Sequence, residues 1–206
     1  ESLTYDRLAQ PDCRAAIGEL TFVTATDGNH GRGIAWTAQQ LGAKSYVYMP
    51  KVSSEQRLRN IQMYATHAEI TPYNYDETVQ YVFRLAGERG WIVTQDTAFE
   101  GYTQFPTWCQ QGYLTLCSEI REQLEAYQDR PTHIFVQAGV GTLAAAVAAY
   151  SAALWGENRP IFVVMEPLKA DCLYQSAAAG EMRSVGGDLD SIMAGLSCGV
   201  PSTVAW

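Results

Sequence analysis

Short apolar runs and longer stretches of helical periodicity alternate along the chain. The apolar runs are rich in β-branched and aromatic residues, which is typical of buried parallel strands. We therefore expect strands at residues 20–25, 45–49, 68–71, 91–94, 133–137 and 161–165.

The stretches between these runs have helical spacing. They predict helices at residues 31–41, 53–64, 76–87, 107–127 and 142–155. Ser53 and Gln56 have the spacing of a capping box at the start of the second helix, and Gly90 is placed to end the third. Repeated strand–helix alternation predicts an α/β fold with open, mostly parallel sheets and flanking helices.

A domain boundary is expected within residues 96–105, where charge, aromatic side chains and glycine separate a predicted strand from a long predicted helix. Residues 1–95 would form a small α/β lobe, and residues 96–206 would form part of a larger one. In open α/β sheets, ligands bind beyond the carboxyl ends of the strands. The strand-to-helix loops are therefore the places where chemistry is expected.

Composition narrows the class of protein. The chain has 206 residues, 47% of them hydrophobic, and a net charge of -8. The negative charge argues against a nucleic-acid partner, because no basic stripe could neutralise phosphates. No apolar run approaches the roughly 18 residues of a membrane span, and no signal segment opens the chain. These features favour a soluble, cytoplasmic protein.

Five scattered cysteines include no Cys-x-x-Cys pair, so neither a metal site nor a redox dithiol is expected. Buried thiols in a reducing compartment are the ordinary explanation. Cys172 and Cys198 bracket a stretch rich in glycine and alanine that a disulfide would immobilise. Whether they join stays open at this point.

The first chemically suggestive loop is TATDGNHGRG, residues 24–33, between a predicted strand and a predicted helix. Gly28 and Gly31 permit a tight turn and a close approach of the backbone to a ligand. Free N–H groups and the helix dipole at such a helix start favour an anion. Asp27 or Asn29 could instead simply cap the helix. Both interpretations remain open.

The second loop lies within FVQAGVGTLAAAVAAY, residues 135–150. Residues 138–141 follow an apolar strand, and Thr142 opens an alanine-rich helix. Successive N–H groups with a hydroxyl at the helix start are a common cradle for a phosphate. It is not a Walker loop, and it lacks the third glycine of a dinucleotide fingerprint. By itself the loop is equally compatible with a structural turn.

The two loops together resemble those of the tryptophan-synthase-β superfamily, the fold-type II enzymes that use pyridoxal phosphate. Most members carry Ser-x-Gly-Asn-His-Gly at the first loop, where this chain has Thr26 and Asp27 in the first two positions. That variant, with YMPK at 48–51, TQDTAFEGY at 94–102 and IMAGLSCGVPS at 192–202, is similar to the diaminopropionate ammonia-lyase family. The resemblance covers nearly the whole chain and implies a two-lobed architecture.

This resemblance implies pyridoxal 5'-phosphate as cofactor and α,β-elimination of ammonia from 2,3-diaminopropionate, giving pyruvate and ammonia. It also implies that the protein is a homodimer and that it binds a small amino acid as its substrate. The cofactor-binding residues that it implies are Asn29, at the phenolic oxygen of the ring, and the phosphate cradle of Ala138, Gly139, Val140, Gly141 and Thr142. The implied substrate-binding residues are Thr26, Gly28 and His30.

The two catalytic residues implied by the resemblance are Asp27 and Asp96. A diamino acid carries an additional ammonium group that Asp27 could attract, and Asp27 could accept the Cα proton opposite the Schiff-base lysine. Asp96 would orient the substrate amine or tune Asp27. Structural alternatives stay open for three residues: Asp96 as a charged loop residue, His30 as a donor to backbone, and Glu166 as a structural residue rather than part of the cofactor rim.

The Schiff-base lysine of this family lies upstream of the first loop. Lys44, Lys51 and Lys169 do not match its context. We therefore expect a fragment, truncated at both ends and inactive by itself. Two other functions remain open: a threonine or serine dehydratase-type lyase that uses the same cofactor, and a non-catalytic ligand-binding relative.

Overall fold

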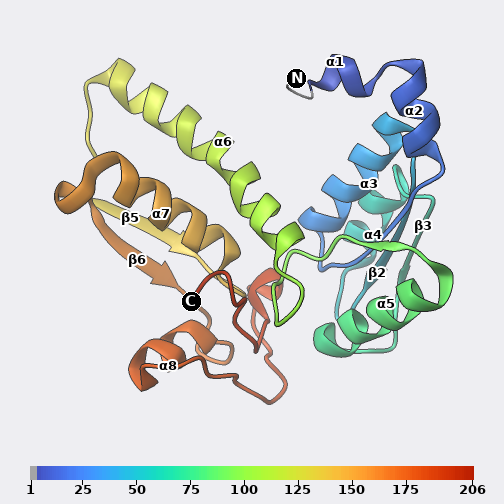
Figure 1. Cartoon of the computed structure of the whole chain (residues 1–206). Helices are drawn as coiled ribbons and strands as arrows, with labels where there is room; N and C mark the ends of the chain where they lie inside the picture. Colours follow the sequence, from blue (N-terminus) through green and yellow to red (C-terminus); the bar gives the residue numbers. More distant parts are fainter. Residues whose placement is uncertain (1–3) are drawn as a thin grey trace. The chain divides into compact units, whose positions relative to one another are not determined.

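The computed structural model describes residues 4–206 (Figure 1). The chain divides into two compact units, Glu1–Gln95 and Asp96–Trp206. Both are built from parallel strands connected by helices, so the chain has the α/β fold that its periodicity predicts.

Unit 1 contains a four-stranded parallel sheet in the order β3-β2-β1-β4. Its strands are β1 Thr21–Ala25, β2 Lys44–Met49, β3 His67–Ile70 and β4 Ile92–Val93. Its helices are α1 Tyr5–Leu8, α2 Pro11–Gly18, α3 Asn29–Leu41, α4 Glu55–Gln62 and α5 Tyr75–Arg89. The sequence pattern did not predict α1 and α2, which contain no buried residue and so leave no apolar stripe to recognise.

Side chains of β2 alternate between two separate cores, because successive residues of a strand point to opposite faces of the sheet. Tyr48 packs with Val82 and Leu85 of α5 on one face. Val47 and Met49 pack with Ala35 of α3 and with Ile61 of α4 on the other. Because β2 is buried on both faces, its sequence is a nearly continuous apolar run.

Helix boundaries in unit 1 correct one prediction and confirm another. Ser54, and not Ser53, is the N-cap of α4, and its hydroxyl accepts from the amide of Arg57. The amide of Ser53 bonds to the carbonyl of Pro50 in a turn, which delays the helix by one residue. The capping box predicted there is therefore wrong. Gly90 ends α5 in the left-handed conformation (φ 67°), as predicted.

The edge strand β4 is shorter than predicted. Only Ile92–Val93 pair as a ladder with β1, and the chain then leaves the sheet. Thr94 still donates from its amide to the carbonyl of Val23 at 2.9 Å. The following Gln95 is fully buried beneath the carboxyl end of β1, where its side-chain oxygen accepts from the amide of Ala25 at 3.0 Å.

Unit 2 contains the parallel pair β5 His133–Gln137 and β6 Ile161–Met165. Its helices are α6 Gln104–Tyr127, α7 Thr142–Trp155 and α8 Cys172–Ala179, with two short 3-10 helices at Gly156–Asn158 and Ala194–Leu196. The two strands and α7 have the predicted bounds. Helix α8 was not predicted.

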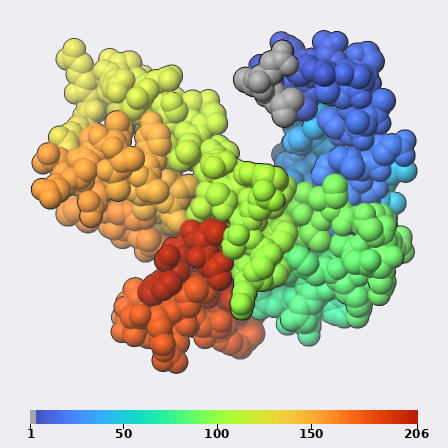
Figure 2. All heavy atoms as spheres, viewed as in Figure 1, coloured from blue at the N-terminus to red at the C-terminus, as the bar shows by residue number. Residues whose placement is uncertain are grey.

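The C-terminal residues of unit 2 fold back over the second loop. The amide of Ser202 donates to the carbonyl of Val140 at 2.8 Å, and Gln110 of α6 donates to the carbonyl of Val204 at 2.9 Å. Figure 2 shows these dark-red atoms packed against the light-green start of α6. Because of these contacts, the loop before α7 is supported by chain that lies far from it in the sequence.

No disulfide joins Cys172 and Cys198, so the bridge that the sequence left open is not formed. Cys172 is fully buried at the start of α8, and this burial raises the pKa of its thiol to about 11. Among the described helices, none has both the length and the apolar character that crossing a bilayer requires.

Candidate functional site

The loop after β1 is organised by the hydroxyl of Thr26. This buried oxygen accepts hydrogen bonds from the amides of Gly28 and Gly31, at 3.0 and 3.1 Å. The N-cap of α3 is Gly28, and no side chain caps the helix there. The interpretation of Asp27 or Asn29 as a simple helix cap is therefore wrong. Both side chains are available for other contacts.

Asp27 is held on one side of this loop by two residues of the segment that follows β2. Its Oδ1 accepts from the hydroxyl of Ser53 at 3.0 Å, and its Oδ2 forms an ion pair with Nη1 of Arg57. The Asp27 side chain is 14% exposed. A mostly buried carboxylate with a charged partner and a hydroxyl partner has a defined orientation, which a catalytic or binding carboxylate needs.

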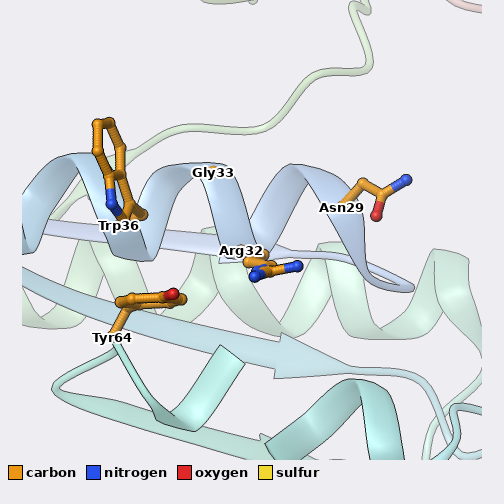
Figure 3. A pocket seen from close by; sticks show the side chains of 5 residues that line it. All are labelled: Asn29, Arg32, Gly33, Trp36 and Tyr64. Atoms are coloured by element: carbon orange, nitrogen blue, oxygen red, sulfur yellow. The ribbon is translucent and has the colours of Figure 1, made fainter. Parts of the chain in front are cut away.

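His30 and Asn29 occupy the first turn of α3 in different ways. The Nε2 of His30 lies 2.6 Å from the carbonyl oxygen of Thr94, which connects the helix to the end of β4. This contact matches the backbone-donor interpretation of His30 rather than that of a catalytic base. Asn29 is exposed and projects away from the helix (Figure 3).

Asn29 also lines a shallow pocket of about 360 Å³ on unit 1 (Figure 3). The guanidinium of Arg32 lies 5.8 Å from the ring centre of Tyr64 at the same pocket, whose other lining residues are Gly33 and Trp36. The pocket has room for a small ligand beside Asn29, whereas Asp27 is not one of its lining residues.

The loop between β5 and α7 presents free backbone donors. In the described part of the chain, no protein acceptor bonds the amides of residues 139–142, and no side chain caps α7. The amide of Ala138 differs, because it bonds to the carbonyl of Met165 at 2.9 Å. The run of amides without a protein acceptor therefore begins at Gly139 and includes Val140, Gly141 and Thr142.

Tight packing explains the two glycines of this loop. A Cβ on Gly139 would lie 3.3 Å from the sulfur of Cys198, and one on Gly141 would lie 2.8 Å from the Cβ of Ala205. Gly141 also has a φ of 97°, which side chains disfavour. Four successive free amides at a helix start fit a phosphate group. This half of the predicted cofactor site is thus chemically suited to pyridoxal phosphate.

Asp96 opens unit 2, and its backbone supports the same loop. Its carbonyl accepts from the hydroxyl of Thr142 at 3.2 Å. Burial raises the pKa of the Cys109 thiol, on α6, to about 11, and the negative charge of the Asp96 carboxylate adds to this shift. The Thr142 hydroxyl therefore already donates to protein, although its amide remains open.

Lys44, Lys51 and Lys169 all have exposed side chains. Lys44 is exposed at the start of β2, and Lys51 is exposed in the turn after it. Lys169 pairs with Asp188 at 3.7 Å on the surface of unit 2. The described residues also contain no cluster of histidine, cysteine or acidic side chains positioned to hold a metal ion.

Sequence reasoning missed Ser53 and Arg57 and left Glu166 undecided. Glu166 follows β6 and accepts from the amides of Leu173 and Tyr174, at 2.9 and 2.8 Å. It therefore caps α8, which has no cap from its own flanking residue. Burial raises the pKa of Glu166, and the two amides partly oppose that shift. No local pattern marks Arg57, because its partner is thirty residues away.

Parallel α/β units with glycine-containing strand-to-helix loops are typical of proteins that bind phosphorylated ligands and cofactors. Residues 6–206 match the family model described as pyridoxal-phosphate dependent enzyme, and the chain belongs to that family.

Within this family, the chain is similar to diaminopropionate ammonia-lyases. The chain is 48% identical over 208 residues to the one from Salmonella typhimurium, covering 100% of this chain and 52% of that protein. The holo diaminopropionate ammonia lyase of Escherichia coli superimposes with a TM-score of 0.90 at 44% identity, covering all of this chain and 50% of the other. The same Escherichia coli protein solved in complex with D-serine gives a TM-score of 0.89 at 44% identity, again over 100% and 50%. The chain thus spans about half the length of the relatives it matches.

Proposed function

We propose that this chain is part of an enzyme that eliminates ammonia from 2,3-diaminopropionate with the help of pyridoxal phosphate. Hydrolysis of the remaining amino acid skeleton releases pyruvate and a second ammonia. The observation that carries the proposal is Asp27, a mostly buried carboxylate in the loop where relatives acting on hydroxy amino acids have a serine-type motif. The 48% identity to a diaminopropionate ammonia-lyase supports it.

Residues of both loops would hold the cofactor. The amides of Gly139, Val140, Gly141 and Thr142 would bind its phosphate, and Asn29 would bind the phenolic oxygen of its ring. When bound, the cofactor ring supplies the electron sink that makes the substrate Cα proton removable. The Schiff-base lysine would come from outside these 206 residues, since the settings of Lys44, Lys51 and Lys169 do not suit that role.

The loop of residues 27–31 would bind the substrate. Its backbone amides would face the substrate carboxylate, and Thr26 would fix the shape of the loop through its bonds to Gly28 and Gly31. Asp27 would attract the second ammonium and accept the Cα proton on one face of the substrate. Asp96 would orient the amine that leaves.

The test uses the full-length protein that contains this chain. Its absorbance spectrum is recorded without and with pyridoxal phosphate, and again after 2,3-diaminopropionate is added. We expect a cofactor band, a spectral change on adding the diamino acid, and two ammonia molecules per pyruvate. Faster ammonia release from serine or threonine would indicate a dehydratase instead. Substrate binding without ammonia release would indicate a non-catalytic relative.

A further inference from the structure

Arg57 contacts the Asp27 loop at three points. Its Nη1 pairs with the Asp27 carboxylate and also donates to the Asp27 main-chain carbonyl at 3.2 Å. Its side chain lies across Gly28, where a Cβ would be 3.4 Å from the Arg57 Cδ. The guanidinium therefore holds both the side chain and the backbone of the loop.

The base of the Arg57 side chain is fixed, but its end is accessible. The Arg57 amide bonds to the hydroxyl of Ser54 at 3.3 Å in the first turn of α4. The side chain itself is 44% exposed, and no other described carboxylate pairs with it. A half-exposed guanidinium on a rigid helix can leave its partner without disturbing the fold, because water solvates it readily.

Ser53 holds the other carboxylate oxygen and carries no charge. If Arg57 withdraws, the Ser53 hydrogen bond can keep the carboxylate oriented while its negative charge becomes available. A substrate with an ammonium on Cβ would offer Asp27 a replacement positive charge. A substrate with a hydroxyl at that carbon would not.

From this arrangement we infer that Arg57 is a positioning and specificity residue: it neutralises Asp27 while the site is empty and yields that carboxylate to the second ammonium of a diamino acid. The inference rests on the function proposed above. Ser53 keeps its hydrogen bond to Asp27 and so holds the orientation of the carboxylate while the substrate ammonium replaces Arg57.

The test is kinetic and uses the full-length enzyme loaded with pyridoxal phosphate. In Arg57→Gln, the unneutralised carboxylate should attract the second ammonium of the substrate more strongly, so the KM for 2,3-diaminopropionate should fall about fivefold. The kcat should also fall, because the carboxylate loses one orienting contact. The KM for serine should change less than about twofold. Arg57→Lys keeps the charge and should restore a KM near that of the unmodified enzyme.

A binding measurement separates this role from a structural one. The spectral change of the loaded enzyme is titrated with 2,4-diaminobutyrate and with 2-aminobutyrate, which differ by one ammonium group and have no leaving group at Cβ. Arg57→Gln should tighten binding of the first about fivefold relative to the second. In an Asp27→Asn background, the same change should have no effect on that ratio.

Arg59→Gln is the matched control. Arg59 lies on the same helix but donates to the side chain of Gln56 and pairs with no acidic residue in the described part of the chain, so this change should leave all constants unaltered. The inference would be overturned if Arg57→Gln changed the constants for 2,3-diaminopropionate and serine equally, and those for 2,4-diaminobutyrate and 2-aminobutyrate equally. The contact of Arg57 with Asp27 would then have only a structural role. Absence of diaminopropionate turnover in the unmodified enzyme would instead reject the proposed function, and the binding ratio would still test Arg57.

Discussion

The hydroxyl of Thr26 accepts a hydrogen bond from the amide of Gly31, 3.1 Å away in the next turn of chain. That approach requires glycine at position 31. A Cβ there would lie 2.3 Å from Cγ2 of Thr26 and 2.8 Å from Cγ1 of Val47. The loop that presents Asp27 therefore depends on close contact of the α3 backbone with Thr26, which follows β1, and with Val47 of β2.

Replacing Gly31 with alanine should lower the free energy of unfolding by about 1–3 kcal/mol, because Thr26 and Val47 must shift to make room. Urea denaturation measures this. Gly33 is the control, since a Cβ on it meets nothing within 4 Å in the same helix. Gly33→Ala should be neutral or stabilise by up to about 1 kcal/mol. Equal losses in both variants would contradict the packing argument.

Asp27→Asn should affect the two isomers of the substrate unequally. If Asp27 takes the Cα proton on one face and the Schiff-base lysine acts on the other, loss of the carboxylate removes only one base. We expect turnover of D-2,3-diaminopropionate to fall about 100-fold or more, and turnover of the L isomer to fall much less. Steady-state rates of pyruvate formation from each isomer decide this. Equal losses would reject the two-base mechanism.

Glu166→Ala should loosen the start of α8. The variant leaves the amides of Leu173 and Tyr174 without their carboxylate acceptor, and the loss of a helix cap costs about 1–2 kcal/mol. The free energy of unfolding and amide hydrogen exchange at these two residues should both report it. Glu122→Ala, an exposed change on α6, should leave both measurements unaltered. Unchanged protection of Leu173 in the Glu166 variant would show that water replaces the cap.

The buried thiol of Cys172 should make stability depend on alkaline pH. Burial raises its pKa from 9.0 to about 11 in the folded protein, so the unfolded chain releases this proton first as the pH rises. The contribution is complete below pH 9 and is lost as the pH approaches about 11, with a size of about 2–3 kcal/mol.

Cys172→Ala removes this titration. The difference in unfolding free energy between the original protein and the variant should therefore shrink between pH 8 and pH 11, as measured by urea denaturation at each pH. The cavity left by the missing sulfur costs the same at every pH and does not change the slope. Parallel curves would show that the thiol does not titrate differently in the folded state.

Strong local signals predicted much of the fold. The strands β5 and β6 and the helix α7 have the predicted bounds, because apolar runs preceded by prolines or followed by glycines leave few alternatives. Gly90 ends α5 as predicted, because glycine readily adopts the left-handed conformation that terminates a helix. Helix α8 was missed because its apolar face is short and its N-terminus is capped by Glu166, which lies before it in a different segment.

The site was only partly predictable. The glycine loop before α7 was located from its own residues, and its role in binding a phosphate stays a prediction. Side-chain partners were not recognised. The sequence left Asp27 or Asn29 open as a cap of α3, whereas neither caps it and the Thr26 hydroxyl accepts from the amides of Gly28 and Gly31.

The amino-acid sequence by itself determined the alternation of the strands with helices α3 to α7, the two glycine-containing loops and the presence of a carboxylate at position 27. Tertiary structure alone decided that Arg57 and Ser53 hold this carboxylate, since it brings the turn after β2 beside the loop after β1. The reason is physical. Periodicity and turn chemistry depend on neighbours along the chain, whereas an ion pair across thirty residues depends on how two adjacent parallel strands place their carboxyl ends.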